Sequence, residues 1–249
     1  KVQDHQNTVL HLMNIDGSNR RIISSGLDES VSDITWDTSG KGLYFMYDEK
    51  GNTKIGYITI SGKISKLTDN VGGTTIGRPY ASGSYSVSNK GVIAYTQTRP
   101  EYPAELAVIQ NKKTPKLITG LNADVLAHRQ LGEVEEVWYK STFDGRDIQG
   151  WIVKPPFYDA SKSYPLLVEN HGGPILNYGD RFTAEIQLYA ADGYVVFYPN
   201  PRGSTSYGEE FGNLLKNNYP GQDYNDVMDG VDYLVEKGIA NNDKLFVTG

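Results

Sequence analysis

The stretch "YPLLVENHGGPILNYG" (164–179) joins an apolar run to a loop with unusual backbone freedom. Residues 165–170 read as a short buried strand, and a histidine, two glycines and a proline follow at once. A short apolar run bounded by turn residues is typical of a central strand in a parallel sheet. Gly172 and Gly173 carry no side chain, so the backbone there can approach a ligand closely. We therefore expect a sheet whose strand ends face a site at this loop.

The rest of residues 129–249 alternates between strand and helix patterns. "VEEVWYKSTFDGRDIQGWIVKPP" (134–156) predicts a hairpin that turns at an Asp-Gly pair. Apolar strands at 194–200 and 244–249 alternate with helical spacings at 181–193 and 223–238. Buried strands that alternate with helices predict an α/β fold, a doubly wound, mostly parallel sheet with helices on both faces.

Residues 1–128 have a different pattern. They consist of short strands rich in Val, Ile and Tyr, most of them followed by turn residues, with no long helical periodicity. A weak repeat begins at Ile15, Ile60 and Ile109, in "IDGSNRRIIS", "ISGKISKLT" and "IQNKKTPKLIT". This period suits four-stranded β-propeller blades, and "DITWDTSGKGLYF" (33–45) suits an inner hairpin of one blade. About two and a half blades fit, whereas a propeller has about four to eight, so we expect the chain to begin inside a propeller.

Charge separates the same two halves. Residues 1–128 carry 14 Lys and Arg against 12 Asp and Glu, whereas residues 129–249 carry 10 against 18. This step and the change of pattern predict two domains, 1–128 and 129–249. The acidic second half argues against nucleic acid as a partner.

Composition excludes several classes of site. The chain has no cysteine, so disulfides, thiolate metal sites and thiol nucleophiles are excluded. The histidines are dispersed without metal-binding spacing, and we expect neither a metal nor a cofactor. No apolar run approaches the roughly 18–20 residues of a membrane span, so a membrane partner is not expected. We expect a soluble protein, cytoplasmic or periplasmic. The first residue is Lys rather than Met, so the native N-terminus is expected upstream and the compartment stays open.

Four aspartates recur every third residue, at Asp223, Asp226, Asp229 and Asp232. They have two interpretations, a cation site or a solvated helix face whose first members are favoured by the helix dipole. We favour the solvated face.

The candidate site combines two loops that each follow an apolar strand. In the first, amides near Gly172 and Gly173 can point at a developing oxyanion, although a plain Gly-Pro loop would look similar. In the second, "YPNPRGSTSYGEEF" (198–211), Arg202 offers a bidentate fork and Tyr207 a hydroxyl. The alternative for Arg202 is a structural ion pair with a carboxylate such as Glu209 or Asp223.

Four motifs in this order resemble the prolyl oligopeptidase family of serine peptidases, closest to its acylaminoacyl-peptidase and dipeptidyl-peptidase 5 branch. They are "DGRDIQGW" (144–151), "HGGP" (171–174), "NPRGSTSYGEEF" (200–211) and "GQDYNDVMDGVDYL" (221–234). The stretch "RPEYPAELAV" (99–108) also looks like that branch. The resemblance implies a β-propeller that caps an α/β-hydrolase domain, with a Ser-Asp-His triad that cleaves short peptides.

The resemblance also implies roles for individual residues. Gly173 aligns with the oxyanion glycine, whose main-chain N–H binds the tetrahedral oxygen. His171 stands where relatives have a tyrosine or a histidine, and two roles stay open for it, a second donor or a residue that only holds the loop. Asn200 and Arg202 are expected to order the oxyanion loop.

In this family the strand before the nucleophile ends in a G-x-S-x-G elbow, and "KLFVTG" (244–249) resembles that strand. Gly249 would be the first glycine of the elbow, and the serine would lie two positions further. No other G-x-S-x-G occurs in the 249 residues, and the triad Asp and His are expected downstream. We therefore expect the chain by itself to be inactive and the activity to belong to a longer protein.

Two alternatives remain open. A carboxylesterase of the α/β-hydrolase type would use the same oxyanion geometry, and a degenerate hydrolase with a propeller would bind peptides without chemistry. The blades ahead of the domain favour the peptidase, because simple esterases lack them. Association into a homo-oligomer is plausible through an exposed propeller edge.

Overall fold

The computed structural model describes residues 5–110 and 114–249. In the strand-rich half, which covers residues 5–128, chain order gives β1 (His11–Leu12), β2 (Arg21–Ile22), β3 (Ser32–Trp36), β4 (Gly42–Glu49), β5 (Asn52–Thr59), β6 (Ile64–Val71), β7 (Tyr85–Val87), β8 (Ile93–Arg99), β9 (Tyr102–Ile109), β10 (Lys116–Leu117) and α1 (Ala123–Leu126). In the α/β half, residues 129–249, follow β11 (Val134–Lys140), β12 (Asp147–Val153), β13 (Tyr164–Glu169), α2 (Ala184–Ala191), β14 (Val195–Asn200), α3 (Gly208–Gly212), α4 (Asp223–Glu236) and β15 (Ala240–Thr248).

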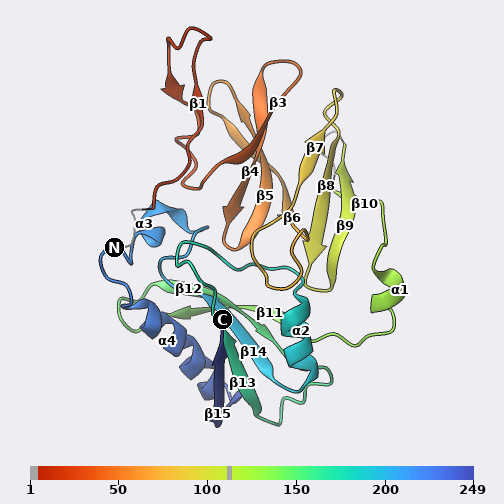
Figure 1. Ribbon diagram of the computed structural model, residues 1–249, viewed down its shortest axis with the longest axis vertical. Helices are drawn as coiled ribbons and strands as arrows, with labels where there is room; N and C mark the ends of the chain where they lie inside the picture. Colours follow the sequence, from red (N-terminus) through yellow and green to blue (C-terminus); the bar gives the residue numbers. More distant parts are fainter. Residues whose placement is uncertain (1–4, 111–113) are drawn as a thin grey trace.

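The strand-rich half is built from antiparallel groups of the size of propeller blades (Figure 1). Strands β3–β6 form one group and β7–β10 a second, joined by a single pairing of Val71 with Gln97. Strands β1 and β2 form a separate hairpin. The predicted partial propeller is thus confirmed as two groups and part of a third. Within the described residues the strands do not close into a ring.

The weak sequence repeat corresponds to the outer hairpins of these groups. Ile60 follows β5 and Ile109 ends β9, and each strand pairs with the next one along the chain. The predicted inner hairpin is β3–β4, where Thr35 pairs with Tyr44. The turn predicted in the third copy of the repeat includes residues 111–113, which lie outside the described residues.

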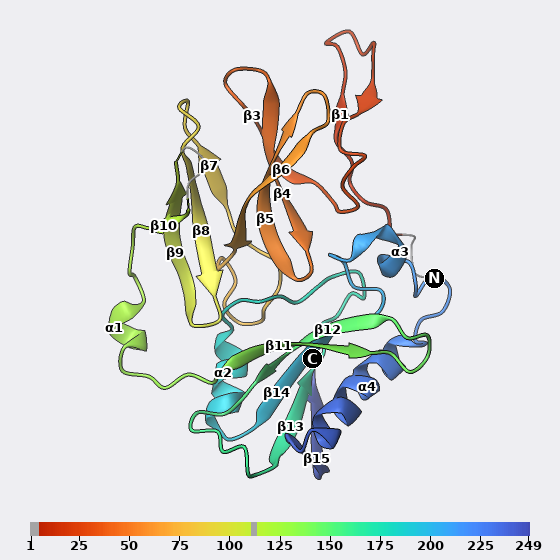
Figure 2. The same cartoon turned by 180° about the vertical axis from the view of Figure 1, so that it is seen from behind.

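The α/β half contains one mixed five-stranded sheet in the order β11-β12-β14-β13-β15 (Figure 2). Strand β13 lies parallel to both β14 and β15, while β11 and β12 continue the sheet in antiparallel fashion. The predicted hairpin is therefore part of the same sheet, and its Asp-Gly turn places Gly145 at φ 74°. This is the α/β-hydrolase type of sheet that the sequence predicts.

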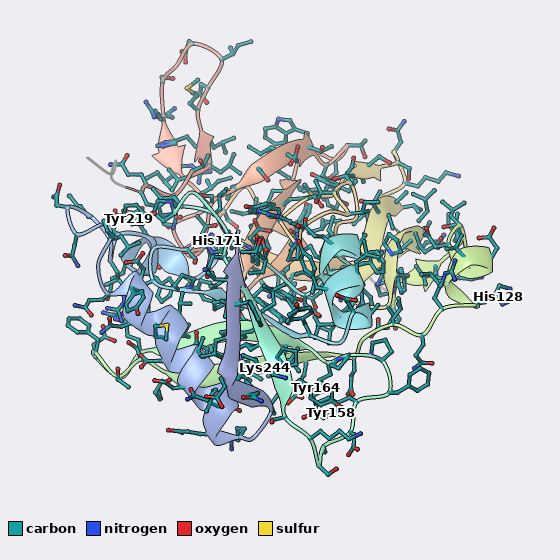
Figure 3. The ribbon with its side chains drawn as sticks, turned by 60° about the horizontal axis from the view of Figure 1, so that its bottom comes forward. His128, Tyr158, Tyr164, His171, Tyr219 and Lys244 are labelled. Atoms are coloured by element: carbon teal, nitrogen blue, oxygen red, sulfur yellow. The ribbon has the colours of Figure 1, made fainter. Side chains whose placement is uncertain are left out.

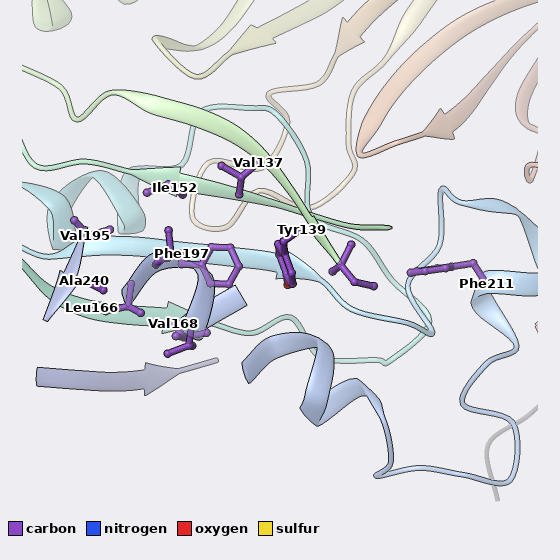
Figure 4. Close-up of a cluster of buried hydrophobic side chains, with 12 residues drawn as sticks. Val137, Tyr139, Ile152, Leu166, Val168, Val195, Phe197, Phe211 and Ala240 are labelled. Atoms are coloured by element: carbon purple, nitrogen blue, oxygen red, sulfur yellow. The ribbon is translucent and has the colours of Figure 1, made fainter. Parts of the chain in front are cut away.

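Helices α2 and α4 cover opposite faces of this sheet, because alternate residues of each strand point to opposite sides. On one face Phe197 and Val195 pack with Val231 and Leu234 of α4 in a buried cluster (Figure 4). On the other face Val196 and Tyr198 pack with Ile186 of α2. Within the described residues no helix combines the length and apolar character needed to cross a membrane.

The two halves contact each other beside the strand ends. Residues 76–80 of the strand-rich half run along residues 178–185, with Tyr80 and Tyr178 in an antiparallel bridge. Arg181 is buried and donates to the carbonyl oxygens of Gly51 and Tyr80, each at 2.8 Å. The α/β half is therefore hydrogen-bonded to the strand-rich half close to its candidate site.

Candidate functional site

Residues 170–177, the glycine loop, follow β13 and have a backbone that glycine alone tolerates at one position. Gly173 lies at φ 131°, a region that L side chains rarely adopt. A Cβ there would lie 2.8 Å from the nitrogen of Ile175 and 3.3 Å from Cγ of Leu176. At Gly172 a Cβ would meet no atom within 4 Å. Glycine is thus required at Gly173, where the loop approaches its own backbone.

Consecutive amides of the glycine loop have no acceptor in the part of the chain that the structure describes. Within the described residues, the N–H groups of His171, Gly172 and Gly173 donate no hydrogen bond. Gly172 and Gly173 are exposed, so these donors are open to solvent. A run of unpaired, exposed N–H groups is the arrangement that stabilises an oxyanion.

The glycine loop lies at the C-terminal edge of the sheet, beside the end of β15. Glu169 pairs with Thr248, and the N–H of Asn170 donates to the carbonyl oxygen of Thr248 at 3.0 Å. Figure 3 shows His171 near the tip of β15. Open α/β sheets bind ligands at this edge, so the free amides stand where a reaction centre is expected.

The ring of His171 is engaged at both nitrogens. Nδ1 lies 3.0 Å from the carbonyl oxygen of Gly172, and Nε2 lies 3.0 Å from Oγ of Ser204. Burial lowers the pKa of His171, which favours the neutral ring. Oγ of Ser204 also donates to the carbonyl oxygen of Pro201 at 2.6 Å, so the ring is bonded through Ser204 to the second loop. Of the two roles left open by the sequence, this geometry favours the one in which His171 holds the loop.

Asn200 joins the end of β14 to the residue that follows the glycine loop. Its Oδ1 accepts from the N–H of Tyr178 at 2.8 Å, and its Nδ2 donates to the carbonyl oxygen of Tyr178 at 2.9 Å. Nδ2 also donates to the hydroxyl of Tyr207 at 2.7 Å. The side chain is fully buried. Asn200 therefore imitates a backbone partner and fixes the loop exit to the sheet.

Tyr207 does not belong to the glycine loop and is linked to it through Asn200. Its hydroxyl donates to Oε1 of Gln149 at 2.6 Å and accepts from Asn200. Burial raises its pKa, so the hydroxyl stays protonated. Ser204 and Thr205 also contact the glycine loop, since the N–H of Thr205 donates to the carbonyl oxygen of Leu176 at 3.0 Å. The two predicted loops are therefore bonded to each other along their length.

Arg202 is a buried structural cation. Its Nε and Nη2 donate to the two oxygens of Asp226, each at 2.8 Å, and Nη1 lies 3.1 Å from Asp144. Hydrogen bonds to Asp226 raise the pKa of Arg202. The structural alternative, an ion pair with a carboxylate, is what the structure contains, but the suggested partners Glu209 and Asp223 are wrong. The real partner lies one helical turn after Asp223, because α4 presents Asp226 to the sheet.

The aspartate series of α4 is not a solvated face throughout, which corrects the interpretation favoured from sequence. Asp226 is fully buried against Arg202. Asp229 accepts from the N–H and the hydroxyl of Thr142, both at 2.8 Å. Only Asp232 is exposed. Aspartates spaced by three residues lie along one side of α4, and this side packs against the turn of the β11–β12 hairpin. Within residues 5–110 and 114–249 no group of three or more His, Asp and Glu side chains could hold a metal ion.

A cavity of about 540 Å³ opens between the glycine loop, the end of β15 and α4. Its walls are mostly apolar, with the oxyanion-type backbone at one end. The lining includes His171, Gly173, Pro174, Tyr219, Met228 and Val247. The cavity therefore lies next to the free amides of the glycine loop.

Sequence reasoning missed two residues that hold the glycine loop. Glu169 ends the apolar run of β13 but is buried, and its Oε1 accepts from the hydroxyl of Tyr178 at 2.8 Å. A carboxylate at the end of a buried strand was the available signal. Tyr178 had none, since 18 tyrosines are spread along the chain.

Comparison with known proteins agrees with these features. Residues 180–249 match the prolyl oligopeptidase family. The chain is 34% identical over 203 residues, 81% of its length, to an uncharacterized peptidase named YuxL from Bacillus subtilis, of which it covers 30%. It is 27% identical over 234 residues, 92% of its length, to dipeptidyl-peptidase 5 of Porphyromonas gingivalis, of which it covers 33%. The chain thus spans about a third of the length of these relatives.

Solved structures share the fold. Pyrococcus horikoshii acylaminoacyl peptidase superposes with a TM-score of 0.77 at 24% identity, over 94% of this chain and 35% of that one. Porphyromonas gingivalis dipeptidyl peptidase 4 gives 0.74 at 20% identity, over 96% and 34%. The family model matches part of the α/β half, whereas the sequence relatives and the fold match extend into the strand-rich half. Residues 180–249 match the prolyl oligopeptidase family, and these relatives and structures support a member of that family.

Proposed function

We propose that this chain is part of a serine peptidase that hydrolyses short peptides. The observation that carries the proposal is the run of unpaired amides at His171–Gly173 beside the end of β15. Relatives named as dipeptidyl and acylaminoacyl peptidases support the substrate class. We also propose the division into a propeller part, 1–128, and a hydrolase part, 129–249.

In the proposed mechanism the N–H of Gly173 binds the carbonyl oxygen of the scissile peptide as it becomes negative. The attacking serine is assigned to the second residue after Gly249, with a histidine and an aspartate further along the protein. The serine hydroxyl adds to the carbonyl carbon while the imidazole takes its proton, and the amine leaves with that proton. Water then releases the acyl group by the same route. On this proposal the 249 residues alone give no turnover.

His171 and Asn200 serve this mechanism through the glycine loop. The ring of His171 bonds the loop to Ser204, and Asn200 bonds its exit to β14. Because these contacts are made before substrate arrives, the amides need not reorganise when charge develops. The strand-rich half, docked at residues 178–185, would restrict access to short and flexible peptides.

A carboxylesterase remains the second candidate, because the free amides of the glycine loop serve an ester carbonyl as well as a peptide carbonyl. The experiment compares a dipeptidyl anilide, an N-acetylated aminoacyl anilide and a short-chain p-nitrophenyl ester on the full-length protein. A serine-directed fluorophosphonate marks the nucleophile. Peptidase activity that the reagent abolishes is the expected result.

Three outcomes would contradict the proposal. Ester turnover without anilide turnover would favour the esterase. Tight peptide binding by calorimetry without turnover or labelling would favour a binding module. Turnover by residues 1–249 alone, blocked by the reagent, would refute the assignment of the serine beyond Gly249.

A further inference from the structure

Glu169 is a buried carboxylate at the entrance of the glycine loop. Its side chain is 1% exposed, and Oε1 accepts the hydroxyl hydrogen of Tyr178. Within the described residues Oε2 has no hydrogen-bond partner. A buried carboxylate is costly to keep unless a cation compensates it. The ionised form of Glu169 therefore depends on a positive charge beside it.

Tyr178 stands at the other end of the same loop. The loop enters at Glu169 and leaves at Tyr178, so their hydrogen bond closes its base. Asn200 holds both backbone groups of Tyr178, which fixes the exit to β14. The conformation of the free amides between these two residues thus depends on the hydrogen bonds that fix Glu169 and Tyr178.

The compensating cation comes from the strand-rich half. Nε of Arg78 forms an ion pair with Oε1 of Glu169 at 3.2 Å and donates to Oε2 of Glu185 at 3.4 Å. Burial raises the pKa of Glu169, whereas the Tyr178 bond and the charge of Arg78 oppose that rise. The charged and titratable groups around Glu169 thus come from the strand-rich half, the glycine loop and α2.

The backbone around Arg78 is fixed on both sides. The carbonyl oxygen of Ile76 accepts from the N–H of Ala184 at 2.7 Å, and that of Gly77 accepts from the hydroxyl of Thr183 at 2.6 Å. After Arg78, the carbonyl oxygen of Pro79 accepts from the N–H of Gly179 at 3.0 Å. Arg78 therefore reaches Glu169 only while the strand-rich half is docked.

We propose that Arg78 is a positioning residue for the oxyanion-binding amides, which holds the glycine loop through Glu169 and Tyr178 and couples its geometry to docking of the strand-rich half. This inference rests on the proposed peptidase function. Without Arg78 the buried carboxylate loses its cation, and the base of the loop relaxes. These amides bind the substrate oxygen mainly when it carries negative charge. Displaced amides therefore stabilise the transition state less, while substrate binding changes little.

The test uses the full-length protein with Arg78→Met, Arg78→Lys and, as matched control, Glu185→Gln. The control removes the other carboxylate partner of Arg78 and keeps the ion pair between Arg78 and Glu169, while loss of the Glu185 charge only removes a repulsion on Glu169. We expect Arg78→Met to lower kcat about 10- to 100-fold with KM nearly unchanged. Arg78→Lys should restore most of the loss, and Glu185→Gln should behave as the wild type. Melting temperatures verify that each variant folds.

A second readout does not need catalysis. Hydrogen exchange at the bonded amides of Asn170, Leu176 and Tyr178 should be faster in Arg78→Met and unchanged in Glu185→Gln. In a Glu169→Gln background, replacing Arg78 should have no further effect, and this pair keeps the test valid if Arg78→Met alone is unstable.

The inference is overturned if Arg78→Met and Glu185→Gln give the same kinetics and the same hydrogen exchange. It is also overturned if Arg78→Met raises KM and leaves hydrogen exchange unchanged. If the wild type has no peptidase activity, the proposed function fails, and exchange alone decides on Arg78. Faster exchange at the amides of Asn170, Leu176 and Tyr178 then supports its positioning role, and unchanged exchange refutes it.

Discussion

The amide of Asn170 donates a 3.0 Å hydrogen bond to the carbonyl oxygen of Thr248. This bond ties the first residue of the glycine loop to the last residue of β15, although they are distant in sequence. Parallel pairing of β13 with β15 makes the contact possible, because it brings both C-terminal ends to one edge of the sheet. The free amides at residues 171–173 are consequently held beside whatever follows β15.

Replacing Gly173 with Ala should impair the glycine loop. At φ 131° the new Cβ would lie 2.8 Å from the nitrogen of Ile175, so the backbone must shift. Displacing an oxyanion donor costs on the order of 10²–10³ in kcat, and we expect a loss of that size in the full-length protein. Gly172→Ala is the matched comparison, since its Cβ meets nothing within 4 Å. Equal losses in the two variants would argue against a special role for Gly173.

Asn200→Ala should destabilise the fold. The substitution leaves the N–H of Tyr178 without its partner, and its carbonyl oxygen keeps only the 3.3 Å bond from Asn177, in a place where no exposed surface remains. Each unsatisfied buried group costs about 1–3 kcal/mol. Urea unfolding of the full-length protein measures the change, with exposed Asn89→Ala as control. If the free energy of unfolding falls no more than in Asn89→Ala, water replaces the hydrogen bonds of Asn200 without cost.

Arg202→Met should destabilise the fold more strongly than removal of a surface arginine. It leaves Asp226, which is fully buried, without its cation. Breaking a buried pair from one side costs about 3–5 kcal/mol. Arg146→Met is the control, because that side chain is 38% exposed and pairs with Asp144 and Glu210, whose side chains are 27% and 76% exposed. Similar unfolding free energies for both variants would contradict the structural role of Arg202.

Stability at the contact between the halves should fall as pH rises. Burial raises the pKa of Glu29 to about 8, and its Oε1 accepts from the N–H of Gly208 at 3.2 Å. A carboxyl whose folded pKa exceeds its unfolded value stabilises the fold below the unfolded value, near 4.5, and loses that contribution as pH rises through 8. Melting temperatures of the wild type should therefore decline between these values more than those of Glu29→Gln. Exposed Glu101→Gln should keep the wild-type slope, and a parallel decline in Glu29→Gln would refute the assignment.

Local patterns in the sequence were sufficient for most elements. The apolar runs of β13 and β14 and the spacing of Val227, Val231 and Leu234 in α4 depend on neighbours within one element, so they can be read from one segment. The hairpins of the strand-rich half follow from turn residues in the same way. Helix α3 was not predicted because its five residues, "GEEFG", carry too little periodicity for a helix signal.

Residue identity also pointed to the glycine loop, because only glycine tolerates the backbone found at Gly173. Identity alone could not assign the partners. Arg202 was matched with the wrong carboxylate, Asp226 was taken for a solvated residue, and Glu169 and Tyr178 were not recognised. Each of these depends on contacts between segments far apart in the chain.

The sequence by itself determined the kinds of element, their order and the place of the flexible glycine pair, since these depend on local sterics and on hydrophobic period. The tertiary structure alone decided which charges are buried together, which amides stay unpaired, and that Arg78 of one half reaches Glu169 of the other. Burial and pairing arise only when distant strands align, because desolvation is a property of the assembled sheet and not of any single segment.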